Sequence, residues 1–143
     1  MQSTSNAGSR TEPAAQSLSV LIVDDVADTR ELYERYMQFQ GMRVITAPDG
    51  IAALQAIHLE PPDVIVLDLA MPRMTGWEVI GILKGDPRTQ DIPIVALSGH
   101  RAKDTALTAG ADSYLEKPCL PSTLLAEVLR LLREPGPRTP HRQ

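Results

Sequence analysis

Five polar residues have the types and the spacing that could do chemistry. Each lies at or just past the end of a short apolar run: Asp24, Asp25, Asp68, Ser98 and Lys117. Three carboxylates in one crevice would repel one another and raise some of their pKa values unless a cation or a lysine neutralised them. Oxygen ligands with so small a footprint favour Mg²⁺, a hard cation that keeps several of its waters.

A carboxylate beside Mg²⁺ can attack a phosphoryl group, because the metal draws in the phosphoryl oxygens and offsets the charge that would repel the nucleophile. The product would be an acyl phosphate on Asp68, with Lys117 and the Ser98 hydroxyl each contacting a phosphoryl oxygen. Taken singly, each residue has a plainer explanation. Asp24 and Asp25 suit a strand end or a helix cap, Asp68 a turn, and Lys117 the surface. Their joint placement favours the site.

The elements that would position these residues alternate along the chain. Short apolar runs predict strands, and the stretches of helical period between them predict helices. The predicted strands cover 18–23, 42–47, 64–67, 92–97 and 112–115, and the predicted helices cover 27–39, 51–58, 75–84, 101–108 and 121–133. Asp49 can cap the second helix, and Leu32, Tyr36 and Phe39 are predicted to share one face of the first.

Strict alternation of strands and helices, with near-continuous Val, Ile and Leu in the strands, predicts a parallel sheet covered on both faces and joined by right-handed crossovers. The fold class is α/β, a doubly wound (βα)5 sandwich. In such a sheet the carboxyl ends of adjacent strands converge on a crevice at the topological switch point. The five polar residues are therefore expected to meet there.

The composition limits the other possibilities. A chain of 143 residues, 43% of them hydrophobic, suits one domain, expected at 18–134 between disordered tails at 1–17 and 135–143. No apolar run approaches the ~20 residues of a spanning helix and no signal peptide is evident, which predicts a cytoplasmic protein without membrane insertion. A net charge of −4 with dispersed Lys and Arg argues against direct nucleic-acid binding. The single cysteine, Cys119, excludes an internal disulfide.

Four motifs together resemble the receiver domain of bacterial response regulators. They are LIVDD at 21–25, VIVLDLAMPRMTG at 64–76, IVALSG at 94–99 and AGADSYLEKP at 109–118. The resemblance runs from about Leu18 to Leu132. It implies a flavodoxin-like strand order, 2-1-3-4-5, and a module that catalyses only its own aspartyl phosphorylation and dephosphorylation rather than acting as an enzyme.

The resemblance also implies the metal site. Asp68 corresponds to the phospho-acceptor and Asp25 to a direct Mg²⁺ ligand, with Asp24 helping, often through water. The backbone carbonyl of Ala70 is expected to complete the protein ligands.

Further residues match the part of the family motif that responds to phosphorylation. Ser98 resembles the hydroxyl switch residue, Lys117 the phosphate-contacting lysine, and Tyr114 the aromatic that changes rotamer when the hydroxyl moves. The Lys117–Pro118 bond is usually cis in the family. His100 could lean over the site and tune dephosphorylation, although an exposed loop histidine is the commoner case.

One spacing departs from the family pattern. Ser98 and Lys117 are 19 positions apart, shorter than usual by roughly one helical turn, and the loss falls in the fourth helix. The implied phosphodonor is a sensor histidine kinase or a histidine phosphotransfer protein. No output segment follows Arg133 in the sequence, so a downstream protein target is expected, as for single-domain regulators.

Two other functions compete with this interpretation. A haloacid-dehalogenase-like phosphatase would also form an aspartyl phosphate, but it expects a second aspartate where this chain has Ala70. A phosphorylation-independent receiver-like interaction module would keep the fold without the switch. The complete set of polar strand-end residues argues against that module, and the shortened fourth helix keeps it open.

Overall fold

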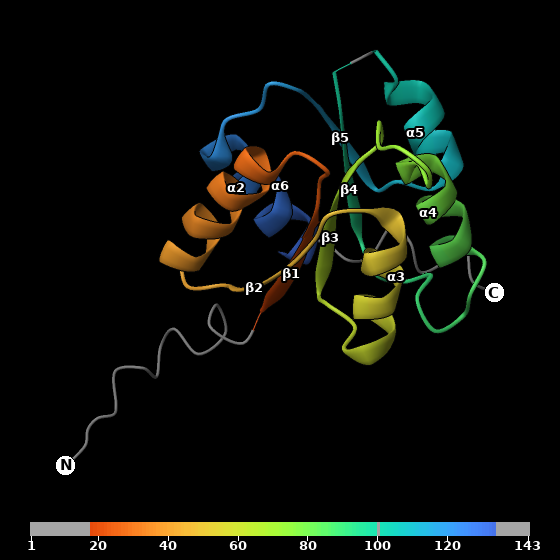
Figure 1. Ribbon diagram of the computed structural model, residues 1–143, viewed down its shortest axis with the longest axis horizontal. Helices are drawn as coiled ribbons and strands as arrows, with labels where there is room; N and C mark the ends of the chain where they lie inside the picture. Colours follow the sequence, from red (N-terminus) through yellow and green to blue (C-terminus); the bar gives the residue numbers. More distant parts are fainter. Residues whose placement is uncertain (1–17, 100, 134–143) are drawn as a thin grey trace.

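The computed structural model describes residues 18–99 and 101–133. Strands and helices alternate along this part of the chain (Figure 1). They are β1 (Ser19–Val23), α2 (Ala27–Phe39), β2 (Arg43–Ala47), α3 (Gly50–Leu59), β3 (Val64–Asp68), α4 (Gly76–Lys84), β4 (Ile94–Ser98), α5 (Lys103–Ala109), β5 (Ser113–Glu116) and α6 (Pro121–Arg133). Every predicted strand and helix is present, with bounds that differ by at most two residues.

The five strands form one parallel sheet in the order β2-β1-β3-β4-β5. Strands β1, β3 and β4 are buried along their whole length, which explains their unbroken apolar sequences. The predicted doubly wound α/β fold and its strand order are confirmed. The order reverses between β1 and β3, so the crevice that such a reversal creates lies beside the ends of these two strands.

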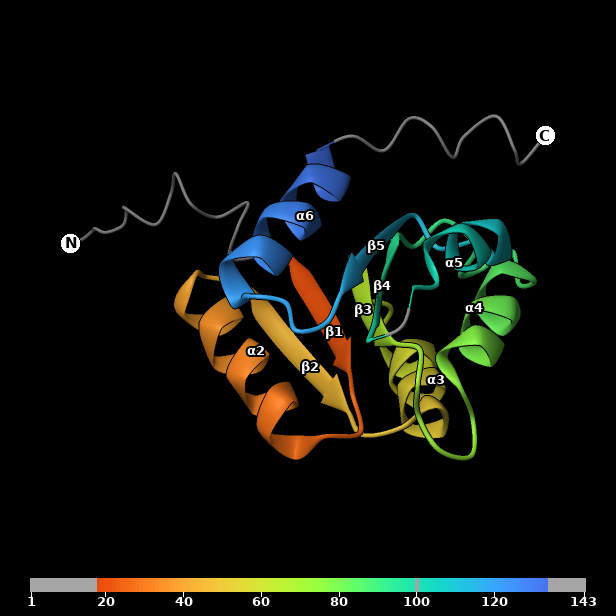
Figure 2. The same ribbon diagram turned by 90° about the horizontal axis from the view of Figure 1, so that it is seen from above.

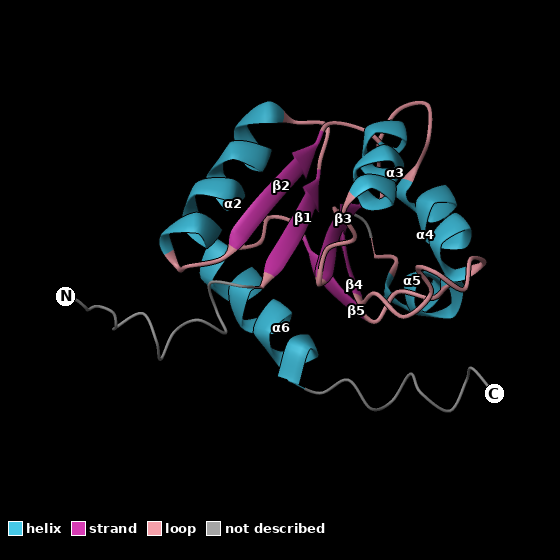
Figure 3. Ribbon diagram, turned by 90° about the horizontal axis from the view of Figure 1, so that it is seen from below, coloured by secondary structure: helices cyan, strands magenta, loops and turns pink. Residues whose placement is uncertain are grey.

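Helices cover both faces of the sheet. Helices α2 and α6 lie on one face, and α3, α4 and α5 lie on the other (Figures 2 and 3). Each face has its own apolar core, one built around residues such as Met37, Val66 and Leu124, the other around Ile57, Leu67 and Ile80. The sheet is therefore packed from both sides and has little freedom to shift under the site.

Two helices on the second face begin with side-chain caps. The Asp49 carboxylate accepts the Ala52 N–H at 2.8 Å, as predicted. Thr75 and Glu78 form a reciprocal capping box at the start of α4. Both caps lie in the loops that follow strands, so they fix where the chain turns away from the sheet.

The face of α2 that contains Leu32, Tyr36 and Phe39 is not the face that packs on the sheet. Tyr33 and Met37 are the buried residues of this helix, whereas Leu32 is 54% exposed and Phe39 is 86% exposed. Leu32, Tyr36 and Phe39 have a spacing that fits one face of a helix. Tyr33 and Met37 follow Leu32 and Tyr36 by one position and fit a second face equally well. Packing against the sheet selects the stripe that contains Tyr33.

The amino edge of the sheet carries structural contacts. Asp63, just before β3, accepts the backbone N–H of Ser19 at 2.7 Å. The described chain starts at this edge, just before β1, and α6 runs back to it, away from the carboxyl ends of the strands (Figure 2). Within the described ranges, no helix has the length and apolar character needed to cross a membrane.

Candidate functional site

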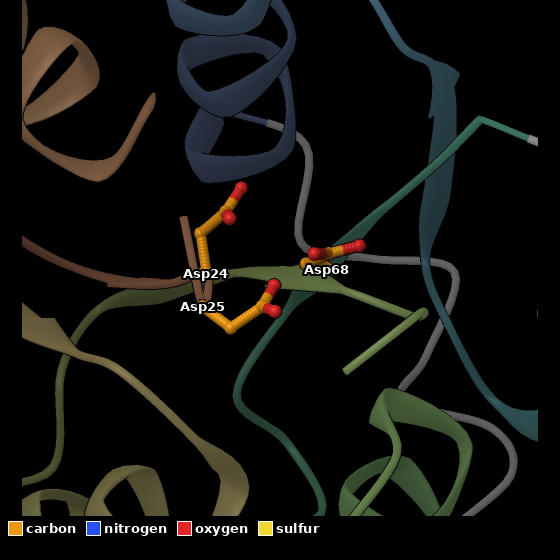
Figure 4. Close-up of side chains that lie close together, drawn as sticks. All are labelled: Asp24, Asp25 and Asp68. Atoms are coloured by element: carbon orange, nitrogen blue, oxygen red, sulfur yellow. The ribbon is translucent and has the colours of Figure 1, made fainter. Parts of the chain in front are cut away.

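Three carboxylates converge at the carboxyl edge of the sheet. Asp24 and Asp25 follow β1 and Asp68 ends β3 (Figure 4). One carboxylate oxygen from each lies within 4.8 Å of the others. Asp24 is 1% exposed and Asp68 is 3% exposed, whereas Asp25 is exposed. The crevice thus has two buried carboxylates and one at its mouth.

Short turns hold the two buried carboxylates. Asp24 Oδ1 accepts the Val26 N–H at 2.9 Å, and Asp68 Oδ1 accepts the Ala70 N–H at 3.1 Å. Each side chain bonds the backbone two residues ahead, a contact that aspartate favours just past a strand. One oxygen of each carboxylate is fixed in this way, and the other faces the crevice.

Lys117 reaches these second oxygens from the end of β5. Its Nζ lies 3.2 Å from Asp24 Oδ2 and 3.5 Å from Asp68 Oδ2. Its backbone N–H donates to the Ser98 carbonyl at 2.9 Å. Burial alone would lower the pKa of Lys117, but Asp68 and Asp24 raise it above its ordinary value. The lysine is therefore a permanent positive charge between two buried carboxylates.

The pKa of Asp68 is raised to about 6. Burial is the largest cause, and the negative charges of Asp24 and Asp25 add to it. Lys117 and the Ala70 N–H oppose the shift. One ammonium does not neutralise three carboxylates, so the crevice retains a surplus of negative charge.

The donor set fits a hard divalent cation. It consists of carboxylate oxygens from two adjacent strand ends, and one of the three carboxylates is open to solvent. Such oxygens suit Mg²⁺, which needs a few carboxylates and keeps its remaining waters. A cation at the mouth of the crevice would offset the surplus negative charge.

Ser98 and Tyr114 lie on the neighbouring strands. Ser98 ends β4, is 3% exposed, and pairs in register with Glu116 of β5. The Tyr114 hydroxyl accepts the backbone N–H of Ala102, just before α5, at 3.1 Å. The Lys117–Pro118 bond is cis, as the resemblance implies. His100 lies outside the described residues.

Sequence reasoning missed the importance of Gly76. A Cβ at this position would lie 2.5 Å from the Asp68 carbonyl oxygen and 2.7 Å from Leu69 Cα. The first turn of α4 therefore packs directly on the backbone of the loop that carries Asp68. The sequence did contain a signal for Gly76, because it is the last residue of the motif at 64–76. Only the fold shows that this glycine approaches the backbone of Asp68 and Leu69.

Sequence reasoning also missed two residues of α2. Arg30 Nη1 donates to the Asp24 carbonyl at 2.7 Å, and the Tyr33 hydroxyl donates to the Cys119 carbonyl at 2.7 Å. Their spacing of three places them on one helical face. Choosing the stripe of α2 that contains Tyr33 and Met37 would have brought Tyr33 to notice.

Known proteins with the same fold and motifs are numerous. Residues 20–129 match the family model described as response regulator receiver domain. The response regulator MprA of Mycobacterium tuberculosis is 40% identical over 124 residues, which are 85% of this chain and 53% of that protein. The chain spans about half the length of the curated relatives it matches.

Solved structures agree with the family match. The chemotaxis response regulator CheY4 of Vibrio cholerae superposes with a TM-score of 0.76 at 33% identity, covering 80% of this chain and 98% of that one. A putative response regulator from Chloroflexus aurantiacus gives 0.78 at 32% identity, covering 82% and 99%. With the fold, strand order and motifs in common, the chain belongs to the response regulator receiver domain family of two-component signalling.

Proposed function

We propose that this chain takes a phosphoryl group onto Asp68 with the help of Mg²⁺. The observation that carries the proposal is the position of the Lys117 ammonium, 3.5 Å from Asp68 Oδ2 and 3.2 Å from Asp24 Oδ2, inside a cluster of three carboxylates. A nucleophilic carboxylate, a fixed cation and further oxygen ligands are the components that aspartyl phosphorylation requires.

The metal would be held by Asp25 and Asp68, with Asp24 helping through water and the Ala70 carbonyl as a further ligand. Asp25 is the exposed carboxylate of the cluster and Ala70 is exposed in the following loop, so both can be reached from solvent. When bound, a divalent cation offsets negative charge and orients phosphoryl oxygens. In the structure, one oxygen of each buried carboxylate accepts a backbone N–H, which leaves the other oxygen for ligands in the crevice.

Asp68 is the nucleophile. One of its carboxylate oxygens forms a bond to phosphorus, and the bond between phosphorus and the donor breaks, with the electron pair leaving on the donor. The Ala70 N–H holds Asp68 Oδ1, which leaves Oδ2 on the side of Lys117. Lys117 then pairs with a phosphoryl oxygen and the Ser98 hydroxyl donates to another, stabilising the charge that develops.

The donor would be a sensor histidine kinase or a histidine phosphotransfer protein, and the output a change of surface read by another protein. Ser98 and Tyr114 would link the site to this surface. They lie on the neighbouring strands β4 and β5, on the same side of the site. In this role the chain catalyses only its own modification. A phosphorylation-independent interaction module is the second candidate, favoured by the seven-residue α5.

Intact-protein mass spectrometry after incubation with acetyl phosphate and Mg²⁺ tests the proposal. The wild type is expected to gain one phosphoryl group, and the gain should disappear with EDTA and in Asp68→Asn. Asp86→Asn is the matched control, because Asp86 lies beyond α4 at the opposite edge of the sheet. Wild type that gains nothing from acetyl phosphate or from purified kinases would favour the phosphorylation-independent module.

A further inference from the structure

Tyr33 is a buried phenol on the inward face of α2. It is 3% exposed, and its hydroxyl donates to the Cys119 carbonyl at 2.7 Å across 86 positions of sequence. Burial is the largest cause that raises the pKa of Tyr33 to about 12, and the nearby side chains of Cys119 and Asp24 add to it. The hydroxyl therefore stays protonated and acts as a donor. A buried phenol requires such a partner, but the partner's place in the chain is what matters here.

Cys119 lies two residues after Lys117, in the loop between β5 and α6. This loop is held on one side by the bond from the Lys117 N–H to the Ser98 carbonyl, and on the other by Tyr33. The lysine side chain has four flexible methylene groups, so the position of its ammonium depends on a fixed backbone. The two bonds together supply that fixed backbone.

The same face of α2 also contacts Asp24, the carboxylate that pairs with Lys117. Arg30 Nη1 donates to the backbone carbonyl of Asp24 at 2.7 Å, one turn before Tyr33. Asp24 Oδ2 is the oxygen that lies 3.2 Å from Lys117 Nζ. One helix therefore sets both ends of the contact between Asp24 and Lys117, one through Arg30 and the other through Tyr33.

We propose that Tyr33 is a positioning residue for phosphoryl transfer, which acts by holding the loop that carries Lys117 so that its ammonium stays between Asp24 and Asp68. The inference rests on the proposed function. The Tyr33 side chain touches neither a metal ligand nor the phosphoryl group. It nevertheless contributes a measurable share of the rate of phosphoryl transfer. A purely structural tyrosine would affect the free energy of unfolding without acting through Lys117.

The test begins with Tyr33→Phe, which keeps the buried ring and removes only the donor. Tyr36→Phe is the matched control on the same helix, because the Tyr36 hydroxyl makes no hydrogen bond within the described part of the chain. The rate of phosphorylation by acetyl phosphate at saturating Mg²⁺ is expected to fall about 3–10-fold in Tyr33→Phe, since one positioning hydrogen bond is lost. The control is expected to keep the wild-type rate.

A double-mutant cycle identifies the route of the effect. If Tyr33 acts through the lysine, Tyr33→Phe should cause no further loss of rate when added to Lys117→Met. A loss of the same size in both backgrounds would overturn the inference and leave a general structural role.

Cys119 supplies a readout that is independent of phosphorylation. It is the only cysteine in the sequence and its carbonyl accepts the Tyr33 hydroxyl. Reaction of its thiol with a maleimide under native conditions is expected to be several-fold faster in Tyr33→Phe and unchanged in Tyr36→Phe. Equal labelling rates in all three proteins would contradict a role for Tyr33 in ordering the loop.

The outcomes separate the two proposals. Wild type that gains no phosphoryl group overturns the proposed function and the role of Tyr33 in transfer with it. Wild type that is phosphorylated while Tyr33→Phe matches Tyr36→Phe in rate overturns the inference about Tyr33 alone.

Discussion

The two sides of the site differ in how firmly they are held. On the side of α2 and β1, the strand is wholly buried and the helix sends two hydrogen bonds to backbone carbonyls near the site, from Arg30 and Tyr33. On the side of α5 and β5, α5 is the shortest helix of the described chain, and Ala106 is its only buried residue. Strand β5 has one buried residue among its four.

In the proposed function, this difference would separate two tasks within one small domain. The carboxylates and the lysine need fixed positions, because a displaced charge loses most of its effect on a reacting group. A surface that reports on the site needs instead a low cost of rearrangement, and such elements come from the weakly packed part of a fold. The open hollow between α5 and β5, lined by Lys103, Thr105 and Tyr114 among others, marks that part. The following changes test the contrast, from the largest expected effect to the smallest.

Gly76→Ala should have the largest effect, because Gly76 packs on the loop that carries Asp68. Its Cβ would lie 2.5 Å from the Asp68 carbonyl oxygen, and neither backbone can move aside without displacing β3 or α4. We expect the free energy of unfolding in urea to fall by about 3 kcal/mol or more. Gly81→Ala on the same helix, with nothing within 4 Å of its Cβ, should instead gain about 0.5–1 kcal/mol. A mild effect of Gly76→Ala would show that the loop beneath it is not firmly held.

Lys117→Met removes the ammonium between Asp24 and Asp68. We expect phosphorylation by acetyl phosphate to slow about 100-fold, the usual cost of losing one fixed group that stabilises developing charge. Lys103→Met, at the start of α5, should leave the rate unchanged because that lysine is exposed, and the ion pairs of Asp24 and Asp68 within the described residues are with Lys117. Similar losses in both variants would mean that the position of Lys117 between the two carboxylates has no special effect on the rate.

The pH dependence of stability tests the raised pKa of Asp68. The folded state raises the pKa of Asp68 from 3.8 to about 6, so protonation stabilises the fold below pH 4 and this contribution is lost as pH rises through 6. In EDTA, the free energy of unfolding of wild type should fall by about 1–2 kcal/mol relative to Asp68→Asn between pH 4 and pH 7. If the free energies of unfolding of the two proteins, measured in urea, change in parallel with pH, the surroundings of Asp68 do not raise its pKa.

Tyr114→Phe should have the smallest effect. It removes the acceptor of the Ala102 N–H at the start of α5, at a local cost of about 0.5–1 kcal/mol. We expect hydrogen exchange over 101–109 to accelerate about 2–5-fold, the equivalent of that cost, with no change in α2 and no change in the rate of phosphorylation by acetyl phosphate. Accelerated exchange in α2 would mean that the two sides are coupled more tightly than their contacts indicate.

Much of this arrangement could be predicted from the sequence. Buried parallel strands have distinctive apolar runs, and the geometry of the sheet brings their polar ends together, so Asp24, Asp68 and Lys117 could be grouped before any contact was known. The contacts of Arg30 and Tyr33 could not be predicted, because their partners are backbone carbonyls whose positions depend on the whole fold. The buried face of α2 could not be predicted for a related reason: Phe39 is apolar, but its turn of the helix finds no partner surface in the described chain.

The return of α6 to the amino edge of the sheet also has a consequence for building larger proteins. Leu18 and Arg133, the two ends of the described chain, both leave the domain at the edge opposite the acidic cluster. A fluorescent reporter or an effector domain fused at either point would leave the mouth of the crevice open to a phosphodonor. Both ends of the described chain are therefore attachment points for other modules that lie away from the acidic cluster.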